Sequence, residues 1–243
     1  MRAGLLAALA AATALHLAPH PRAARLSVRL RSCTTAADVR RAVRRQRWTE
    51  ARASVDAARA ELSLAPSASG PALDPDAEMS YLVALNALIS GLGKARKWRQ
   101  ALALLEEAAV PEAPAAPSVQ CYGAAMNALA TARRGAEAQE LLARMEERGV
   151  PANDFVRSAG LKAVGFDDWR AAVALLERWR AHAAAEGLPP VSEHAHSAAA
   201  AAAARHGEAA ACRAIIDAMR ATGPPPSRCV CAFVDGRRTA ERE

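Results

Sequence analysis

The sequence predicts an all-α fold, a solenoid of tandem αα-hairpins, and three observations carry that prediction. About a quarter of the 243 residues are alanine, the best helix former, whereas only 4% are aromatic. Apolar residues recur at helical spacing, in segments that repeat about every 35 residues. Most repeats end in a glycine followed closely by proline, which stops a helix.

The repeat is clearest in its second helices, where two adjacent aliphatic residues recur at intervals of 37, 34 and 40 residues. These pairs are Leu104/Leu105, Leu141/Leu142, Leu175/Leu176 and Ile215/Ile216. The first helices begin before the runs 86–92, 123–129, 158–164 and 197–204. One hairpin cannot bury its apolar face alone, so we expect the four units 82–118, 119–153, 154–192 and 193–227 to stack into one core. The alternative is an ordinary helical bundle with coincidental spacing.

Three segments flank these units. Trp48-Thr49-Glu50-Ala51 has the same Trp-x-x-Ala start as two later second helices, which indicates a degenerate helical cap repeat over residues 33–62. Residues 63–80 are rich in Ala, Pro and Ser and are expected to form a linker. Residues 228–243 are expected to be a partial repeat or a tail.

The formal charge of +7 lies mostly near the N-terminus. Residues 1–47 carry ten Arg and one acidic residue, so the remaining residues, with 22 basic and 24 acidic side chains, have a net charge of −2. An apolar run from Ala3 to Ala14 is followed by an acid-poor stretch bearing Arg and Ser. This order predicts a cleavable targeting leader over residues 1–32.

The leader resembles the bipartite plastid leaders of algae with complex plastids, although Leu17-Ala18-Pro19 matches their junction motif only in part. We therefore expect an organellar location, plastid rather than mitochondrion. Secretion, or an unstructured Ala- and Arg-rich N-terminus without an address, are the alternatives.

Other classes of protein are disfavoured. No apolar stretch reaches the roughly 20 residues that cross a bilayer as a helix, so no membrane insertion is expected. The sequence has no glycine-rich phosphate loop and no nucleophile motif, and we expect no enzyme activity and no cofactor. His194, His196 and His206, and separately Cys229 and Cys231, lack the spacing of a metal site. Asp167-Asp168 is expected to supply charge at a helix N-terminus.

The repeats resemble those of the pentatricopeptide repeat family. The unit from Val119 to Asn153 matches best, with its Val-x-x-Tyr opening, its Ala138–Leu142 segment and its Met-Glu-Glu-Arg-Gly-Val ending. The resemblance covers about residues 82–227 and implies a right-handed superhelical solenoid that binds single-stranded RNA. The tetratricopeptide repeat, a 34-residue hairpin that binds peptides, is the main alternative, but its Trp-x-x-Leu-Gly-x-x-Tyr first helix is absent.

The resemblance also implies the RNA-binding residues. In that family a residue near the start of each first helix and the last residue of the unit contact one base edge, and hydrophobic residues of adjacent units sandwich the base. Carried over, the edge-reading pairs are Asn86 with Ser118, Gly123 with Asn153, Ser158 with Ser192, and Ser197 with Ser227. Val83 and Phe155 match the sandwiching position, which we call the wedge, whereas Gln120 and His194 do not. The same residue types are also common helix caps.

The sequence therefore leads to the hypothesis of an organellar RNA-binding adaptor that supports transcript processing, stability or translation. Its expected partners are single-stranded RNA and, through weak binding by a short array, other organellar RNA-processing proteins or a second copy of itself. The alternative is a tetratricopeptide-like scaffold for protein–protein interaction.

Overall fold

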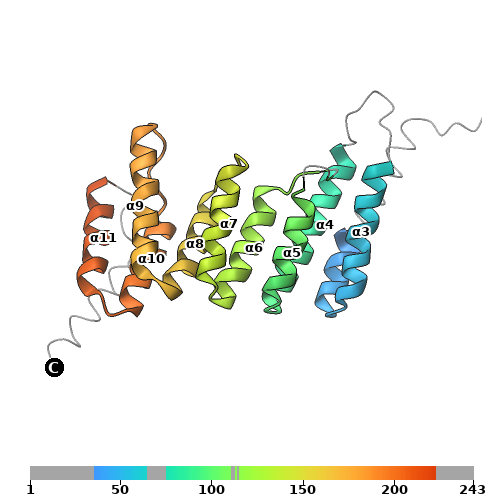
Figure 1. The fold of residues 1–243 in the computed structure, drawn as a ribbon, viewed down its shortest axis with the longest axis horizontal. Helices are drawn as coiled ribbons and strands as arrows, with labels where there is room; N and C mark the ends of the chain where they lie inside the picture. The colour runs from blue at the N-terminus through green and yellow to red at the C-terminus, as the bar shows by residue number, and fades with distance from the viewer. Residues whose placement is uncertain (1–35, 65–74, 111–112, 114, 223–243) are drawn as a thin grey trace, which may run out of the picture. The chain divides into compact units, whose positions relative to one another are not determined.

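The computed structural model of the chain describes residues 36–64, 75–110, 113 and 115–222, and all regular structure among them is helical (Figure 1). The chain forms two compact units, residues 1–84 and 85–243. The predicted leader at 1–32, the predicted tail at 228–243 and Ser227 lie outside the described residues.

The first unit contains a helical hairpin. Residues 36–44 are helical and α3 runs from Trp48 to Leu64. Between them Gln46 adopts a left-handed conformation (φ 57°), and the Arg47 amide donates to the Ala42 carbonyl oxygen at 2.9 Å. This hairpin overlaps the segment 33–62, for which a degenerate helical cap repeat is expected; residues 33–35 lie outside the described residues.

The helix α4 runs from Pro75 to Lys94 and continues from the first unit into the second. It therefore takes in the last part of segment 63–80, which the composition had assigned to a linker. Pro75 is compatible with this because a helix tolerates proline in its first turn, where the missing N–H has no partner to lose. Asp76 and Glu78 add favourable negative charge to the same turn.

The second unit alternates first and second helices in the order predicted from the repeat. After α4 come α5 (Trp98–Ala108), α6 (Val119–Ala132), α7 (Gly135–Glu147), α8 (Asp154–Asp167), α9 (Trp169–Ala185), α10 (Glu193–Arg205) and α11 (Ala209–Thr222). The first helices form one layer, in which α6 packs on α8 and α8 on α10, and each also packs on its own second helix. The aliphatic pairs of the second helices are buried in this core, apart from half-buried Leu175.

Neighbouring first helices approach each other through very small residues. A Cβ added to Gly93 would lie 2.8 Å from the Cβ of Ala128, and one added to Gly165 would lie 2.3 Å from the Cβ of Ala202. All four residues are buried. We call these two contacts, Gly93–Ala128 and Gly165–Ala202, the small-residue seam. It explains why a chain this rich in alanine forms a packed core.

Most hairpin turns share one backbone geometry. Arg96 (φ 59°), Arg133 (φ 55°) and Gly207 (φ 85°) follow first helices in the left-handed conformation. The next amide then donates back to the helix, as Arg134 does to the Leu129 carbonyl at 3.0 Å. This arrangement caps the open carbonyl groups at the helix end. Gly149 and Gly187 do the same after α7 and α9, where the sequence predicted helix stops.

The turn between α8 and α9 is different. Asp168 is the N-cap of α9, and its carboxylate accepts from the Arg170 amide at 2.8 Å. The neighbouring Asp167 carboxylate accepts from the amide of Gly135, the first residue of α7, at 2.8 Å. Both aspartates therefore serve helix N-termini, as predicted, one of them in the preceding repeat.

The seam yields a test within α8. Gly165→Ala adds a methyl where the facing Ala202 leaves no space, and overpacking of this kind typically costs about 1–3 kcal/mol. We expect a net loss of stability, even though alanine improves helix propensity by about 1 kcal/mol. Urea unfolding of the full chain measures the change.

Gly160→Ala is the matched control, because its Cβ would lie 3.1 Å from Cδ1 of Leu142, the end of a flexible side chain. We expect that variant to be as stable as the original or more so, and Gly165→Ala with Ala202→Gly to recover part of the loss. A Gly165→Ala chain as stable as the original would contradict the claim that the small-residue seam leaves no space for a methyl group.

Candidate nucleic-acid interface

Three of the four predicted edge-reading residues of the first helices lie near helix starts. Gly123, Ser158 and Ser197 are the fifth residues of α6, α8 and α10, whereas Asn86 is the twelfth residue of α4. Their partners Ser118, Asn153 and Ser192 are the N-cap residues of α6, α8 and α10. Because α6, α8 and α10 pack in sequence, Gly123 and Asn153, and likewise Ser158 and Ser192, lie on neighbouring helices.

The N-cap residues differ in how they use their side chains. The Asn153 Oδ1 accepts from the Val156 amide at 2.9 Å, so this side chain caps α8. Ser118 makes no capping hydrogen bond, and its Oγ lies 3.5 Å from the Sγ of Cys121. Burial raises the pKa of that thiol, which keeps Cys121 protonated. Asn86 is half-buried and makes no side-chain hydrogen bond to another described residue.

The serine pair of the third repeat, residues 154–192, points inward. Ser158 is only 9% exposed, and its Oγ donates to the Phe155 carbonyl oxygen at 3.1 Å. The Oγ of Ser192 is buried and has no hydrogen-bond partner within the described part of the chain. Neither hydroxyl is presented to solvent, which the sequence pattern does not reveal.

Phe155, the aromatic wedge residue, lies against Gly123 of the preceding repeat, residues 119–153. Phe155 is 56% exposed, although it is a large apolar side chain. A Cβ on Gly123 would lie 2.8 Å from Cδ1 of Phe155, so the ring lies directly against the α6 backbone. Glycine at position 123 therefore creates the space for the ring. Val83, the other predicted wedge residue, is half-buried on α4 in the first unit.

A group of residues that the sequence analysis missed lies at the hairpin turns. The guanidinium carbons of Arg133 and Arg205 lie 4.9 and 4.4 Å from the ring centroid of Phe166. Burial, and then the charge of Arg133, lower the pKa of Arg205. Arg205 also donates to the Gly165 carbonyl oxygen at 3.2 Å, and neither arginine forms an ion pair with a carboxylate of the described residues. We call these three residues the arginine–phenylalanine cluster; two cations held together in this way offer an anion site.

The sequence pattern gives only a weak indication of this cluster. Arg133 and Arg205 each stand just after the apolar run of a first helix, at the place where the chain must turn. A turn arginine is ordinarily a solvated side chain, and nothing in the local sequence shows that these two meet on the ring of Phe166, which belongs to the hairpin between them.

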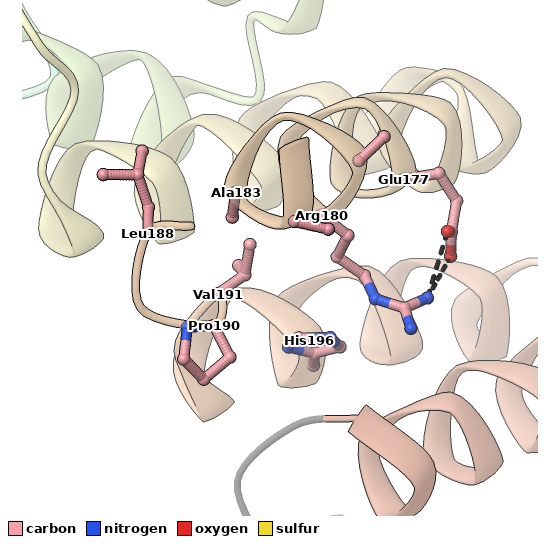
Figure 2. A pocket seen from close by; sticks show the side chains of 9 residues that line it. Glu177, Arg180, Ala183, Leu188, Pro190, Val191 and His196 are labelled. Atoms are coloured by element: carbon pink, nitrogen blue, oxygen red, sulfur yellow. Dashed lines mark hydrogen bonds and ion pairs between the residues drawn. The ribbon is translucent and has the colours of Figure 1, made fainter. Parts of the chain in front are cut away.

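A second feature is a pocket of ≈ 480 Å³ between the end of α9, residues 188–191 and the start of α10 (Figure 2). Its polar lining consists of Glu177, Arg180 and His196, and Arg180 donates to both carboxylate oxygens of Glu177 at 2.9 and 3.0 Å. His196 is 1% exposed. Its Nδ1 lies 3.0 Å from the Ser192 carbonyl oxygen, which can only accept, so Nδ1 carries the proton.

Burial lowers the pKa of His196, and the Arg180 charge lowers it further, whereas the Ser192 carbonyl and Glu177 oppose the shift. The imidazole is therefore neutral in the folded chain near pH 7, with Nε2 as a buried acceptor that no described residue satisfies.

The three histidines do not form a metal site: nowhere in the described part of the chain do three His, Cys, Asp or Glu side chains gather to hold a metal ion. The described helices include none with the length and apolar character needed to cross a membrane.

Comparison with known proteins finds one matching family model and similar solved structures. The model of the PPR repeat, the pentatricopeptide repeat, matches residues 83–108 and 120–150. Among solved structures, the protein PPR10 in complex with an 18-nucleotide psaJ RNA element matches with a TM-score of 0.53 and 23% identity. A triple cysteine-to-serine variant of PPR10 with the same RNA element gives the same values.

The match to PPR10 covers 93% of this chain and 31% of that one, so the chain spans about a third of its length. The likeness confirms the predicted helical-repeat fold. No curated protein sequence matches the chain significantly.

The buried histidine predicts a pH dependence of stability. Because the folded state lowers the pKa of His196 below the value of 6.5 for a free histidine, the unfolded chain binds a proton more readily. The fold should therefore lose stability as the pH falls below about 6.5, until the lowered pKa is passed. Urea unfolding between pH 7.5 and 5 measures this, and His196→Asn should flatten the dependence over that range. If the free energy of unfolding of His196→Asn depended on pH as in the original chain, His196 would not be the group responsible. The control is His194→Asn, which changes an exposed histidine and should leave the pH dependence as it is.

Proposed function

Because the chain carries pentatricopeptide repeats at residues 83–108 and 120–150, we propose that it binds single-stranded RNA along the starts of its first helices. The observation that carries the proposal is Phe155, an aromatic ring that lies on Gly123 and stays 56% exposed. An exposed ring fixed against a helix backbone is a platform on which an unstacked base can stack. The complex of PPR10 with RNA, on the same fold, supports this proposal.

The arginine–phenylalanine cluster supplies positive charge for binding the phosphate backbone of the RNA. Base stacking contributes about 1–3 kcal/mol per base and is indifferent to sequence. Residues 48–243 have a net charge of −2, so attraction for RNA must come from local clusters of cations. Arg133 and Arg205 form such a cluster on Phe166, at the turns that follow α6 and α10. RNA binding by this chain therefore combines stacking at the helix starts with charge at the hairpin turns.

The role we propose is that of an adaptor, which binds a transcript and supports its processing, stability or translation without chemistry of its own. Phe155 is the one aromatic residue at the predicted wedge positions 83, 120, 155 and 194, and one ring supplies little stacking energy, so we propose that this chain acts with other RNA-processing proteins or as a dimer. An organellar location, plastid rather than mitochondrion, is supported by the composition of residues 1–32.

The first test is retention of a single-stranded RNA pool by the full chain at low salt, with double-stranded RNA as the competitor. We expect binding that weakens with salt, because cations displace counterions from phosphates, with a logarithmic slope of about 0.7 per phosphate. Arg133→Ala with Arg205→Ala should lower that slope by about 1. Failure to retain any single-stranded RNA would overturn the proposal in favour of a protein-binding scaffold.

The matched control is Arg144→Ala with Arg178→Ala. This variant removes the same charge from α7 and α9, where the two arginines pair with Glu106 and Glu146. We expect its salt slope to stay within error of the original, because these arginines bridge second helices. An equal fall in both variants would show that only net charge matters.

The location is tested by fusing residues 1–40 to a fluorescent reporter in an algal cell with a complex plastid. We expect the reporter to enter the plastid, and Arg→Ala changes in residues 22–31 to reduce import. A reporter that remains in the cytosol would refute the targeting proposal.

A further inference from the structure

We infer that the hairpin turns form a second RNA-binding surface, which holds a base-paired segment next to the single strand at the helix starts. The inference rests on the proposed function and names its substrate class, an RNA in which a single-stranded segment adjoins a duplex. Two observations carry it: the way aromatic rings hold the arginines at the turns, and the distance from these arginines to the helix starts.

The arginine–phenylalanine cluster is part of a longer row of cations. The guanidinium carbons of Arg99 and Arg134 lie 4.6 and 4.9 Å from the ring centroid of Trp98, the first residue of α5. This repeats the arrangement of two arginines on one ring. Because Arg133 and Arg134 are adjacent in the turn after α6, the two groups are continuous. We call the whole set, which crosses the turns of four successive hairpins, the arginine ladder: Trp98, Arg99, Arg133, Arg134, Phe166 and Arg205.

The arginine ladder keeps an excess of positive charge. All four of its arginines are exposed. Arg134 forms an ion pair with Glu137, whereas the other three form none with a carboxylate of the described residues. The nearby Asp167 carboxylate accepts from the Gly135 amide at 2.8 Å. Four cations against these two carboxylates leave a row that attracts a polyanion.

The rings of the arginine ladder hold cations and are not open platforms for bases. Trp98 and Phe166 are half-buried, and each has two guanidinium groups over it. Phe155 at the helix starts is different, because 56% of it is exposed. Stacking on an open ring favours unpaired bases, so the ladder offers RNA charge with little stacking. A duplex, whose bases are already stacked on one another, is recognised mainly through its phosphates and sugars.

The arginine ladder and the helix starts lie at opposite ends of the first helices. Phe155 and Phe166 are eleven residues apart along α8, which at the rise of an α-helix is about 16 Å. One sugar separates the base of a nucleotide from its phosphate, so a nucleotide stacked on Phe155 cannot place its own phosphate on the ladder. The phosphates held at the turns therefore belong to another segment of the RNA.

A fixed row of cations suits a rigid row of phosphates. The ladder arginines are held over rings, and Arg205 also donates to the Gly165 carbonyl oxygen at 3.2 Å, so they lose little freedom when they bind. With packed helices about 8–10 Å apart, the four hairpins extend the ladder over roughly 24–30 Å. Pairing already orders the phosphates of a duplex, whereas a single strand or an acidic peptide must be ordered to match the row. Paired RNA is therefore the polyanion that fits best.

The experiment compares the affinity of the full chain, at low salt, for three RNAs of equal length. One is a hairpin with a single-stranded tail, one is a fully paired hairpin, and one is an unstructured strand. We expect the tailed hairpin to bind at least about 10-fold more tightly than either of the others, because two linked contacts bind with avidity. Arg99→Ala with Arg134→Ala should remove this advantage, whereas Arg144→Ala with Arg178→Ala, the matched control, should keep it.

Phe155→Ala tests whether the two surfaces are separate. We expect it to weaken binding of the unstructured strand about 5- to 150-fold, the value of one stacked base, and to leave the fully paired hairpin unaffected. Circular dichroism melts confirm that each variant is folded. Equal weakening of the two RNAs by Phe155→Ala would show one shared surface and would overturn the inference.

The remaining outcomes separate the inference from the proposed function. An unstructured strand that binds as tightly as the tailed hairpin would overturn the inference and leave the proposed function intact. The same holds if poly-glutamate binds at the arginine ladder and the paired hairpin does not, which would assign the turns to an acidic protein. Failure of the chain to bind the unstructured strand at all would overturn the proposed function, and the inference with it.

Discussion

The close approach of successive first helices is the constraint on which the rest of the structure depends. At Gly93–Ala128 and Gly165–Ala202 the helices leave no space for a larger side chain. This contact sets the distance from one first helix to the next, and with it the spacing of the helix starts where bases are proposed to bind. A core in which nearly half of the buried hydrophobic residues are alanine gains little free energy from each of them, so it must be packed closely to be stable. The alanine-rich composition and the close stacking of the first helices therefore follow from the same packing requirement.

The proposed RNA surface is made of the same residues that end and begin these helices. Asn153 caps α8, Ser158 closes a bond within the first turn of α8, and Arg133 ends α6 in a left-handed conformation. The capping bond uses only the Oδ1 of exposed Asn153, so its amide N–H groups can still donate. The ring of Phe155 is exposed as well, and paired cations lie on Phe166.

Much of the fold could be predicted from the sequence, because each hairpin is a local unit. The aliphatic pairs of the second helices and the glycine stops at Gly149 and Gly187 were sufficient to place them. The start of α4 at Pro75 was missed, since a proline among Ala and Ser looks like a linker until the helix that follows is included. The site was less predictable. That the Ser158 hydroxyl turns inward, and that Phe155 covers Gly123, depends on side-chain directions set by packing between units. The meeting of Arg133 with Arg205 on Phe166 joins three hairpins that sequence spacing cannot orient.

Hydrogen–deuterium exchange of the full chain, with and without a single-stranded RNA, tests whether RNA binds at the helix starts and the hairpin turns. We expect slower exchange on RNA binding in the helix starts at residues 119–123 and 154–158 and in the turns near Arg133 and Arg205, where we propose that bases and phosphates bind. The second helices α7 and α9 should exchange at the same rate in both states, because they lie in the other layer. Protection confined to α7 and α9, or no change anywhere in the presence of saturating RNA, would contradict it.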